Sequence, residues 1–278
     1  MKEKIQITLL VEEGKELIAM AITNHPKFQG AKKRGKIILK GGSTVSRISE
    51  LLTGRPLSIS GRITSRGTVA GLYEGEEPHV SLLEGNQVKN IDKEFLQEVL
   101  KLGPNDLIVC GANAIDSHGN AGIMSGSPGG GDMAYAFSSW YGEGVPVLIP
   151  VGIEKMIPGN IKDIVQRTGR KRKKLSMGMA VGLIPVWGEI ITEVEALKLM
   201  ANVEAEVIGA GGLGQAQGSI TLDLWGDKKE LEKIIQLITP IKIKAKTISA
   251  DTKSLIECKA PCQYCREHLA CGYRANKF

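Results

Sequence analysis

The chain has 278 residues, of which 42% are hydrophobic, so it can bury a full core, and its length favours one large domain with a smaller companion. We find no apolar run near the ~18 residues of a membrane span and no secretory leader, so we expect a cytoplasmic protein that does not enter a membrane. The net charge of +6 permits anionic ligands, whereas four Phe, three Trp and five Tyr offer few stacking surfaces and argue against nucleic acid.

The chain opens with apolar residues at helical spacing, which predict a helix over residues 5–23. An apolar strand then runs into Gly41, Gly42, Ser43 and Thr44, and an amphipathic helix follows as far as Gly54. Glycines leave backbone N–H groups accessible, hydroxyls add donors, and a helix N-terminus favours negative charge. This pattern predicts a bound phosphate or carboxylate, and its alternative is an ordinary turn capped by Ser43.

A second loop follows a strand predicted from Leu57 to Arg62. Arg62 and Arg66 stand where they could reach an anion held at the first glycine loop, although two solvated arginines are the simpler interpretation.

Further along, a helix is predicted over residues 92–102 and a short buried strand over residues 107–110. The strand opens on a polar loop that contains Asn113 and Asp116, and such loops bind ligands at the carboxyl ends of parallel strands. A second glycine-rich turn then precedes a helix over residues 133–141, and a buried strand follows over residues 145–151. This turn repeats the anion-site pattern with Ser125, Gly126, Ser127, Gly129, Gly130 and Gly131.

The order of these segments resembles ribose-5-phosphate isomerase type A. Gly-Gly-Ser-Thr-Val after a strand is similar to the phosphate loop of that enzyme, and residues 111–116 and 126–131 are similar to its later loops. The similarity spans roughly residues 10–245. It implies the superfamily that unites sugar-phosphate isomerases, glucosamine-phosphate deaminases and acyl-CoA transferases.

The departures from this family concern the catalytic positions. Cys110 and Asn113 stand where the isomerases have aspartates, and no lysine follows near residues 123–125. Aldose–ketose isomerisation needs a carboxylate that moves a proton, so Asp132, near the position of the family's glutamate, and Asp116 are the candidate catalytic bases. We therefore expect weak or absent ribose-5-phosphate isomerase activity.

A basic run at residues 167–174 could bind nucleic acid or coenzyme phosphates, or lie in a solvated loop. The following pattern predicts a ferredoxin-like subdomain. Its strands are expected at residues 186–191, 205–208, 219–225 and 241–246, and its helices at residues 193–200 and 228–237. Residues 209–214 match the spacing of a dinucleotide-binding fingerprint, but no helix follows directly, so we expect a hairpin loop and no NAD.

The last segment contains four closely spaced cysteines, Cys258, Cys262, Cys265 and Cys271. In a chain without a secretion signal, such spacing favours a metal centre over disulfides. We expect an iron–sulfur cluster of the [4Fe–4S] type, with zinc as the alternative.

Together these patterns predict an α/β protein with a Rossmann-like, mostly parallel sheet over residues 1–185, a ferredoxin-like lid over residues 186–246 and a cysteine-rich tail over residues 247–278. The predicted function is to bind, and in an enzyme to transform, a small phosphorylated or carboxylated metabolite. A CoA-transferase-like enzyme and a non-catalytic metabolite or redox sensor are the alternatives. The oligomeric state is left open, with a homo-oligomer as one option.

Overall fold

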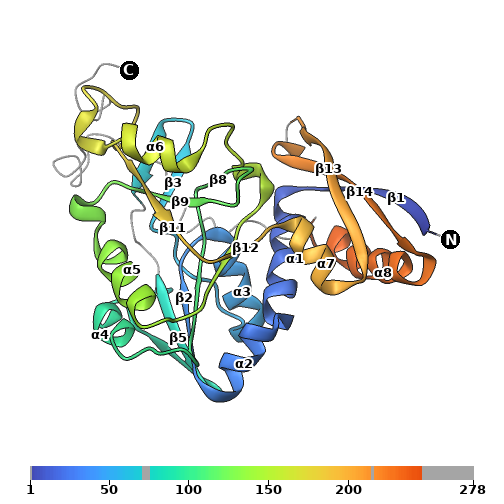
Figure 1. The fold of residues 1–278 in the computed structure, drawn as a ribbon, viewed down its shortest axis with the longest axis horizontal. Helices are drawn as coiled ribbons and strands as arrows, with labels where there is room; N and C mark the ends of the chain where they lie inside the picture. Colours follow the sequence, from blue (N-terminus) through green and yellow to red (C-terminus); the bar gives the residue numbers. More distant parts are fainter. Residues whose placement is uncertain (1, 71–75, 214–215, 246–278) are drawn as a thin grey trace.

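The computed structural model describes residues 2–70, 76–213 and 216–245, and it confirms the α/β class. Its larger sheet contains six strands (Figure 1). Their order is β12 (Glu189–Ile191), β10 (Val147–Pro150), β7 (Leu107–Cys110), β2 (Lys36–Lys40), β5 (Val80–Glu84) and β6 (Gln87–Asn90). The first four strands are parallel to one another, whereas β5 and β6 are antiparallel to their neighbours.

The central strands of this sheet are buried on both faces, as expected for parallel strands between helices. Ile37 and Leu39 of β2 pack on one face, and Ile38 packs on the other. The first face is covered by α1 (Val11–Asn24), α2 (Pro26–Arg34) and α3 (Ser43–Thr53), and the second by α4 (Phe95–Val99) and α5 (Asp132–Gly142).

The N-terminal prediction is wrong for its first residues. Residues 2–9 form strand β1 (Lys2–Leu9), and only the part from Val11 onward is helical. Ile5, Ile7 and Leu9 point to one face at a spacing of two, which is the period of a strand. β1 pairs antiparallel with β14 (Ser219–Asp227), which also pairs with β13 (Val203–Gly211).

The predicted strand over residues 241–246 is also wrong. Helix α8 (Lys228–Ala245) continues past Pro240 as far as the structure describes the chain. Its buried residues keep helical spacing on both sides of the proline; they are Leu231, Ile234, Ile238 and Ile241. Pro240 removes the donor for the carbonyl of Gln236, and Gln236 is exposed, so water can replace that donor.

The smaller sheet is therefore completed by β1 from the start of the chain and not by a final strand. Helices α7 (Glu193–Met200) and α8 pack with it (Figure 1). The sheets do not follow the predicted domain boundary at residue 185. Strand β1, from before this boundary, joins the smaller sheet, and strand β12, from after it, joins the larger sheet. Helix α1 contacts α3, α7 and α8, so one apolar core connects the two sheets.

The remaining elements are short. They are the hairpin β3 (Gly61–Thr64) and β4 (Gly67–Ala70), the sheet of β8 (Ala114–Ile115), β9 (Ala121–Ser125) and β11 (Gly182–Val186), helix α6 (Ile161–Arg167), and the 3-10 helices η1 (Pro128–Gly130), η2 (Ile153–Lys155) and η3 (Arg170–Arg172). β13 and β14 form the hairpin expected near residues 209–214, since Gly211 pairs antiparallel with Ser219. Residues 209–211, however, belong to β13 and not to the loop, and residue 214 lies outside the described residues.

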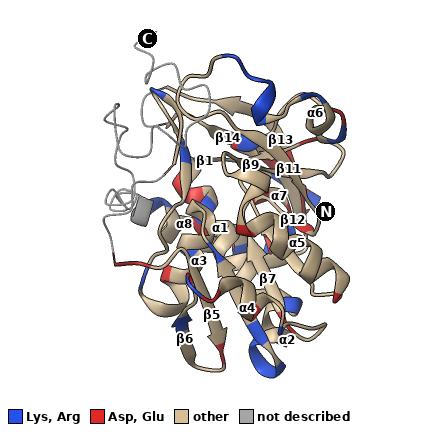
Figure 2. Cartoon of the chain, turned by 90° about the vertical axis from the view of Figure 1, so that its left-hand side faces the viewer, with Lys and Arg blue, Asp and Glu red and all other residues tan. Residues whose placement is uncertain are grey.

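Basic and acidic residues are interspersed along the ribbon in Figure 2, where the basic last turn of α2 is one of the blue segments. Among the described helices, none is both long and apolar enough to pass through a bilayer.

Glu193 is a buried carboxylate where the two sheets meet. It is 2% exposed, and its Oε2 accepts a hydrogen bond of 2.9 Å from the Ile153 N–H. Burial raises the pKa of Glu193 to about 7; the Ile153 hydrogen bond and the Lys155 charge lower it, and the neighbouring Glu154 adds to the rise. Because the folded state then holds a proton that the unfolded state releases near its ordinary pKa of 4.5, stability falls as the pH rises from about 4.5 to 7.

We expect Glu193→Gln to remove this pH dependence. The variant should gain about 2 kcal/mol of unfolding free energy relative to the wild type at pH 8 and little at pH 4.5. Urea unfolding at both pH values measures the difference, with Glu206→Gln, which alters an exposed carboxylate, as the control. A pH-independent effect of Glu193→Gln would contradict the prediction.

Candidate functional site

A cavity of about 1110 Å³ opens at the carboxyl ends of β2 and β7. Most of the residues predicted to bind an anion line it. They are Gly41, Gly42, Ser43, Thr44, Arg62, Asn113, Ser125, Gly126, Ser127, Gly130 and Gly131, together with Asp132. Gly129 lines a neighbouring cavity of about 340 Å³, and Asp116 lines neither cavity. The fold thus brings the two glycine-rich turns together around one space.

The N-terminus of α3 forms one wall of the cavity. Its N-cap residue is Gly42, so no side chain caps the first turn. Thr44 is 2% exposed, and its Oγ1 has no hydrogen-bond partner in the described structure. A buried hydroxyl without a partner costs about 1–3 kcal/mol, and an acceptor or donor supplied by a ligand would remove that cost.

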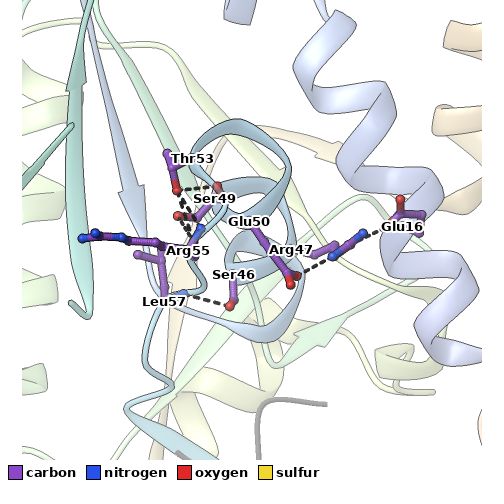
Figure 3. Close-up of polar contacts among 8 residues, drawn as sticks. All are labelled: Glu16, Ser46, Arg47, Ser49, Glu50, Thr53, Arg55 and Leu57. Carbon is purple, nitrogen blue, oxygen red and sulfur yellow. Dashed lines mark hydrogen bonds and ion pairs between the residues drawn. The ribbon is translucent and has the colours of Figure 1, made fainter. Parts of the chain in front are cut away.

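Helix α3 is fixed by polar contacts along its length (Figure 3). The Arg47 guanidinium pairs with Glu16 of α1 and with Glu50, and the hydrogen bond to the buried Glu16 raises the pKa of Arg47. Ser46 Oγ accepts a hydrogen bond of 2.9 Å from the Leu57 N–H. At the other end, Ser49 Oγ donates to the Arg55 carbonyl at 2.9 Å. These contacts hold the first turn of α3 in one position beside the cavity.

Lys40 is a cavity residue that the sequence interpretation missed. It is the last residue of β2 and lies beside Cys110 in the parallel register with β7. Its Nζ lies 5.5 Å from the centre of the Phe95 ring. Burial lowers the pKa of Lys40, although the charges of Asp92 and Asp132 oppose this shift. Within the described residues, Lys40 makes no side-chain hydrogen bond or salt bridge.

A lysine at the end of a buried strand, directly before two glycines, is the sequence signal that could have identified Lys40. Parallel strands place their last residues at the ligand-binding edge of the sheet. Lys155 lines the same cavity from η2, and burial also lowers its pKa. Its Nζ lies 4.0 Å from Oε1 of Glu154, so Lys155 is partly neutralised by a neighbour.

Cys110 lies in the cavity wall, where burial raises the pKa of its thiol to about 12 despite the opposing charge of Lys40. The thiol is therefore neutral near pH 7 and is a poor nucleophile.

Of the two candidate bases, only Asp132 lines the cavity. It begins α5, and within the described structure its carboxylate has no hydrogen bond or salt bridge.

The Asp116 carboxylate instead holds loops together. It accepts hydrogen bonds from the backbone N–H groups of His118, Asn120 and Ile161 and from the Asn120 side chain. Burial alone would raise the pKa of Asp116, but these hydrogen bonds lower it to about 2. A carboxylate with so low a pKa is a weak base.

Asn113 and Arg170 hold the second glycine-rich turn and the residue before it in place. Asn113 Oδ1 accepts a hydrogen bond of 2.9 Å from the Met124 N–H. Arg170 donates to the Gly126 carbonyl at 2.8 Å, and Lys173 Nζ donates to the carbonyls of Gly169 and Val181. Arg172 also donates to the Arg167 carbonyl, at 3.4 Å, so three of the basic side chains are engaged with the protein backbone.

The part of the chain that the structure describes contains no cluster of three or more His, Cys, Asp or Glu that could hold a metal ion. The predicted ligands Cys258, Cys262, Cys265 and Cys271 lie outside the described residues. No family model, curated protein or solved structure matches the chain.

The two glycines before α3 allow a matched test of this loop. A Cβ at Gly41 would lie 2.7 Å from the Ser58 carbonyl oxygen and 2.9 Å from that of His79, whereas a Cβ at Gly42 would meet nothing within 4 Å. We expect Gly41→Ala to destabilise the protein by about 2 kcal/mol, and Gly42→Ala by less than about 1 kcal/mol. Urea unfolding measures both, and equal losses would contradict the geometry.

Proposed function

We propose that this protein binds a small phosphorylated or carboxylated metabolite in the large cavity, with the anionic group at the N-terminus of α3. The observation that carries the proposal is the Thr44 hydroxyl, which is buried beside an uncapped helix end without a partner. The N-terminus of α3 itself favours negative charge. Lys40 lines the same cavity and forms no salt bridge in the described structure, so its amine is open to contact with another part of the ligand.

A divergent sugar-phosphate isomerase-like enzyme is the form of this function that we favour. The parallel strands β10, β7 and β2 with loops at their carboxyl ends are compatible with the Rossmann-like fold that the resemblance implies. Asp132 is the better candidate for a base, because Asp116 is engaged by backbone donors. A CoA-transferase-like enzyme and a metabolite sensor would use the same anion site.

The anion site is tested with Thr44→Val, which removes the hydroxyl and keeps the shape of the side chain. Because Thr44 Oγ1 has no partner, its loss should not lower the urea midpoint. Calorimetric affinity for inorganic phosphate and ribose 5-phosphate should fall about tenfold or more, since a hydrogen bond to a charged group contributes about 1.5–3 kcal/mol.

Thr53→Val is the matched control on the same helix, because Thr53 Oγ1 donates to the Ser49 carbonyl away from the cavity. It should leave phosphate affinity unchanged. If phosphate and ribose 5-phosphate failed to bind the wild-type protein, or crystals soaked with them left residues 41–44 empty, the proposed function would be wrong.

For the C-terminal segment we infer one iron–sulfur cluster held by Cys258, Cys262, Cys265 and Cys271, with mononuclear zinc as the alternative. Anaerobically purified protein should be brown and lose its iron in the Cys262→Ala variant. Because both metals need thiolates, binding should also weaken at acid pH. Cys110→Ala is the control and should retain the metal; metal analysis that showed the reverse would contradict the assignment.

A further inference from the structure

The cations that line the cavity differ in whether the protein neutralises them. Lys15 pairs with Glu12 at 2.5 Å, and Arg47 pairs with Glu16 and Glu50. Lys40 lines the same cavity, and within the described residues its side chain forms no hydrogen bond or salt bridge.

The surroundings of Lys40 make its amine easier to deprotonate than that of an exposed lysine. Its backbone lies in the sheet between β5 and β7, and its side chain extends over the Phe95 ring. Burial lowers the pKa of Lys40, while the groups that face it, Asp92, Asp132 and Cys110, oppose this shift. The Asp92 carboxylate also accepts hydrogen bonds from the backbone N–H groups of His79 and Val80. A neutral lysine amine is a nucleophile toward carbonyl carbon.

We propose that Lys40 forms an imine with the aldehyde or ketone group of the metabolite whose anionic group is held at the N-terminus of α3. The inference rests on the proposed anion site and adds a carbonyl group to the ligand class. Lys40 ends β2, and only Gly41 and Gly42 separate it from the first turn of α3, so the amine and the anion cradle line one cavity.

The covalent step needs no further reactant. The amine lone pair attacks the carbonyl carbon, and the carbonyl oxygen takes up a proton, which gives a carbinolamine. Loss of water then forms the C=N bond, so amine and carbonyl compound yield imine and water. When the imine nitrogen takes up a proton, the iminium cation that results draws electrons from the adjacent C–H bond. Asp132, the carboxylate of the cavity without a hydrogen bond or salt bridge in the described structure, is the group that would accept the proton of that bond.

Pyridoxal 5′-phosphate is a suitable probe, because it carries an aldehyde and a phosphate group. The protein is treated with it at pH 7 and reduced with borohydride, and the modified lysines are identified by peptide mass. We expect Lys40 to be modified faster than the exposed Lys101, because burial lowers the pKa of Lys40 and so enlarges the neutral, reactive fraction of its amine. Inorganic phosphate should protect Lys40, and pyridoxal without phosphate should react more slowly with it.

Lys40→Arg is the matched variant, since arginine keeps the positive charge and cannot form the imine. The Lys40→Arg variant should still bind phosphate in calorimetry, but position 40 should no longer be modified by pyridoxal 5′-phosphate. The Lys155→Arg variant should still bind phosphate, and its Lys40 should still be modified. Phosphate binding without modification of Lys40 would overturn the imine and leave the proposed function intact. Absence of phosphate binding would overturn the proposed function itself. The inference would also be overturned if inorganic phosphate did not protect Lys40. The same holds if pyridoxal modified Lys40 as fast as pyridoxal 5′-phosphate does.

Discussion

The parallel register between β2 and β7 is the constraint on which the site depends. It sets Lys40 beside Cys110 at the edge where both strands end, after the buried residues Ile37, Ile38 and Leu39 of β2. Side chains alternate along a strand, so Lys40 projects to the same side as Ile38, toward α4. The chain must then turn away within Gly41 and Gly42, which brings the start of α3 to the same edge.

The same constraint explains the electrostatics of the cavity. Carboxylates on α1 and α3 neutralise the cations of those helices, as in the pair of Lys15 with Glu12. Lys40, in contrast, ends the buried central strand β2, which contains no Asp or Glu that could pair with it. Within the described residues Lys40 therefore forms no salt bridge, unlike Lys15 and Arg47.

Local sequence patterns identified the glycine loop, α3 and α5, because these depend on residues that are close in the chain. The same patterns gave the wrong secondary structure where contacts with distant parts of the chain determine it. Ile5 and Ile7 suit a strand only because β14 lies beside them, and α8 passes Pro240 because Ile241 remains in the core. Lys40 was missed for a related reason. Its place in the cavity wall depends on Phe95 and Cys110, and both residues lie more than fifty positions further along the sequence.

Helix α1 shows how the smaller sheet bears on the site. Glu12 and Lys15 on its first turns line the cavity, whereas Leu17 and Ile18 belong to the core shared with α8 and β14. On the same helix, Gly14 approaches Glu193 so closely that a Cβ added at Gly14 would overlap the Oε1 atom of Glu193. Since α1 reaches both the cavity and the smaller sheet, any shift of that sheet must move the cavity wall or disrupt the shared core. This arrangement makes the smaller sheet a support for the cavity wall formed by α1 and, through Glu16 and Arg47, for the position of α3.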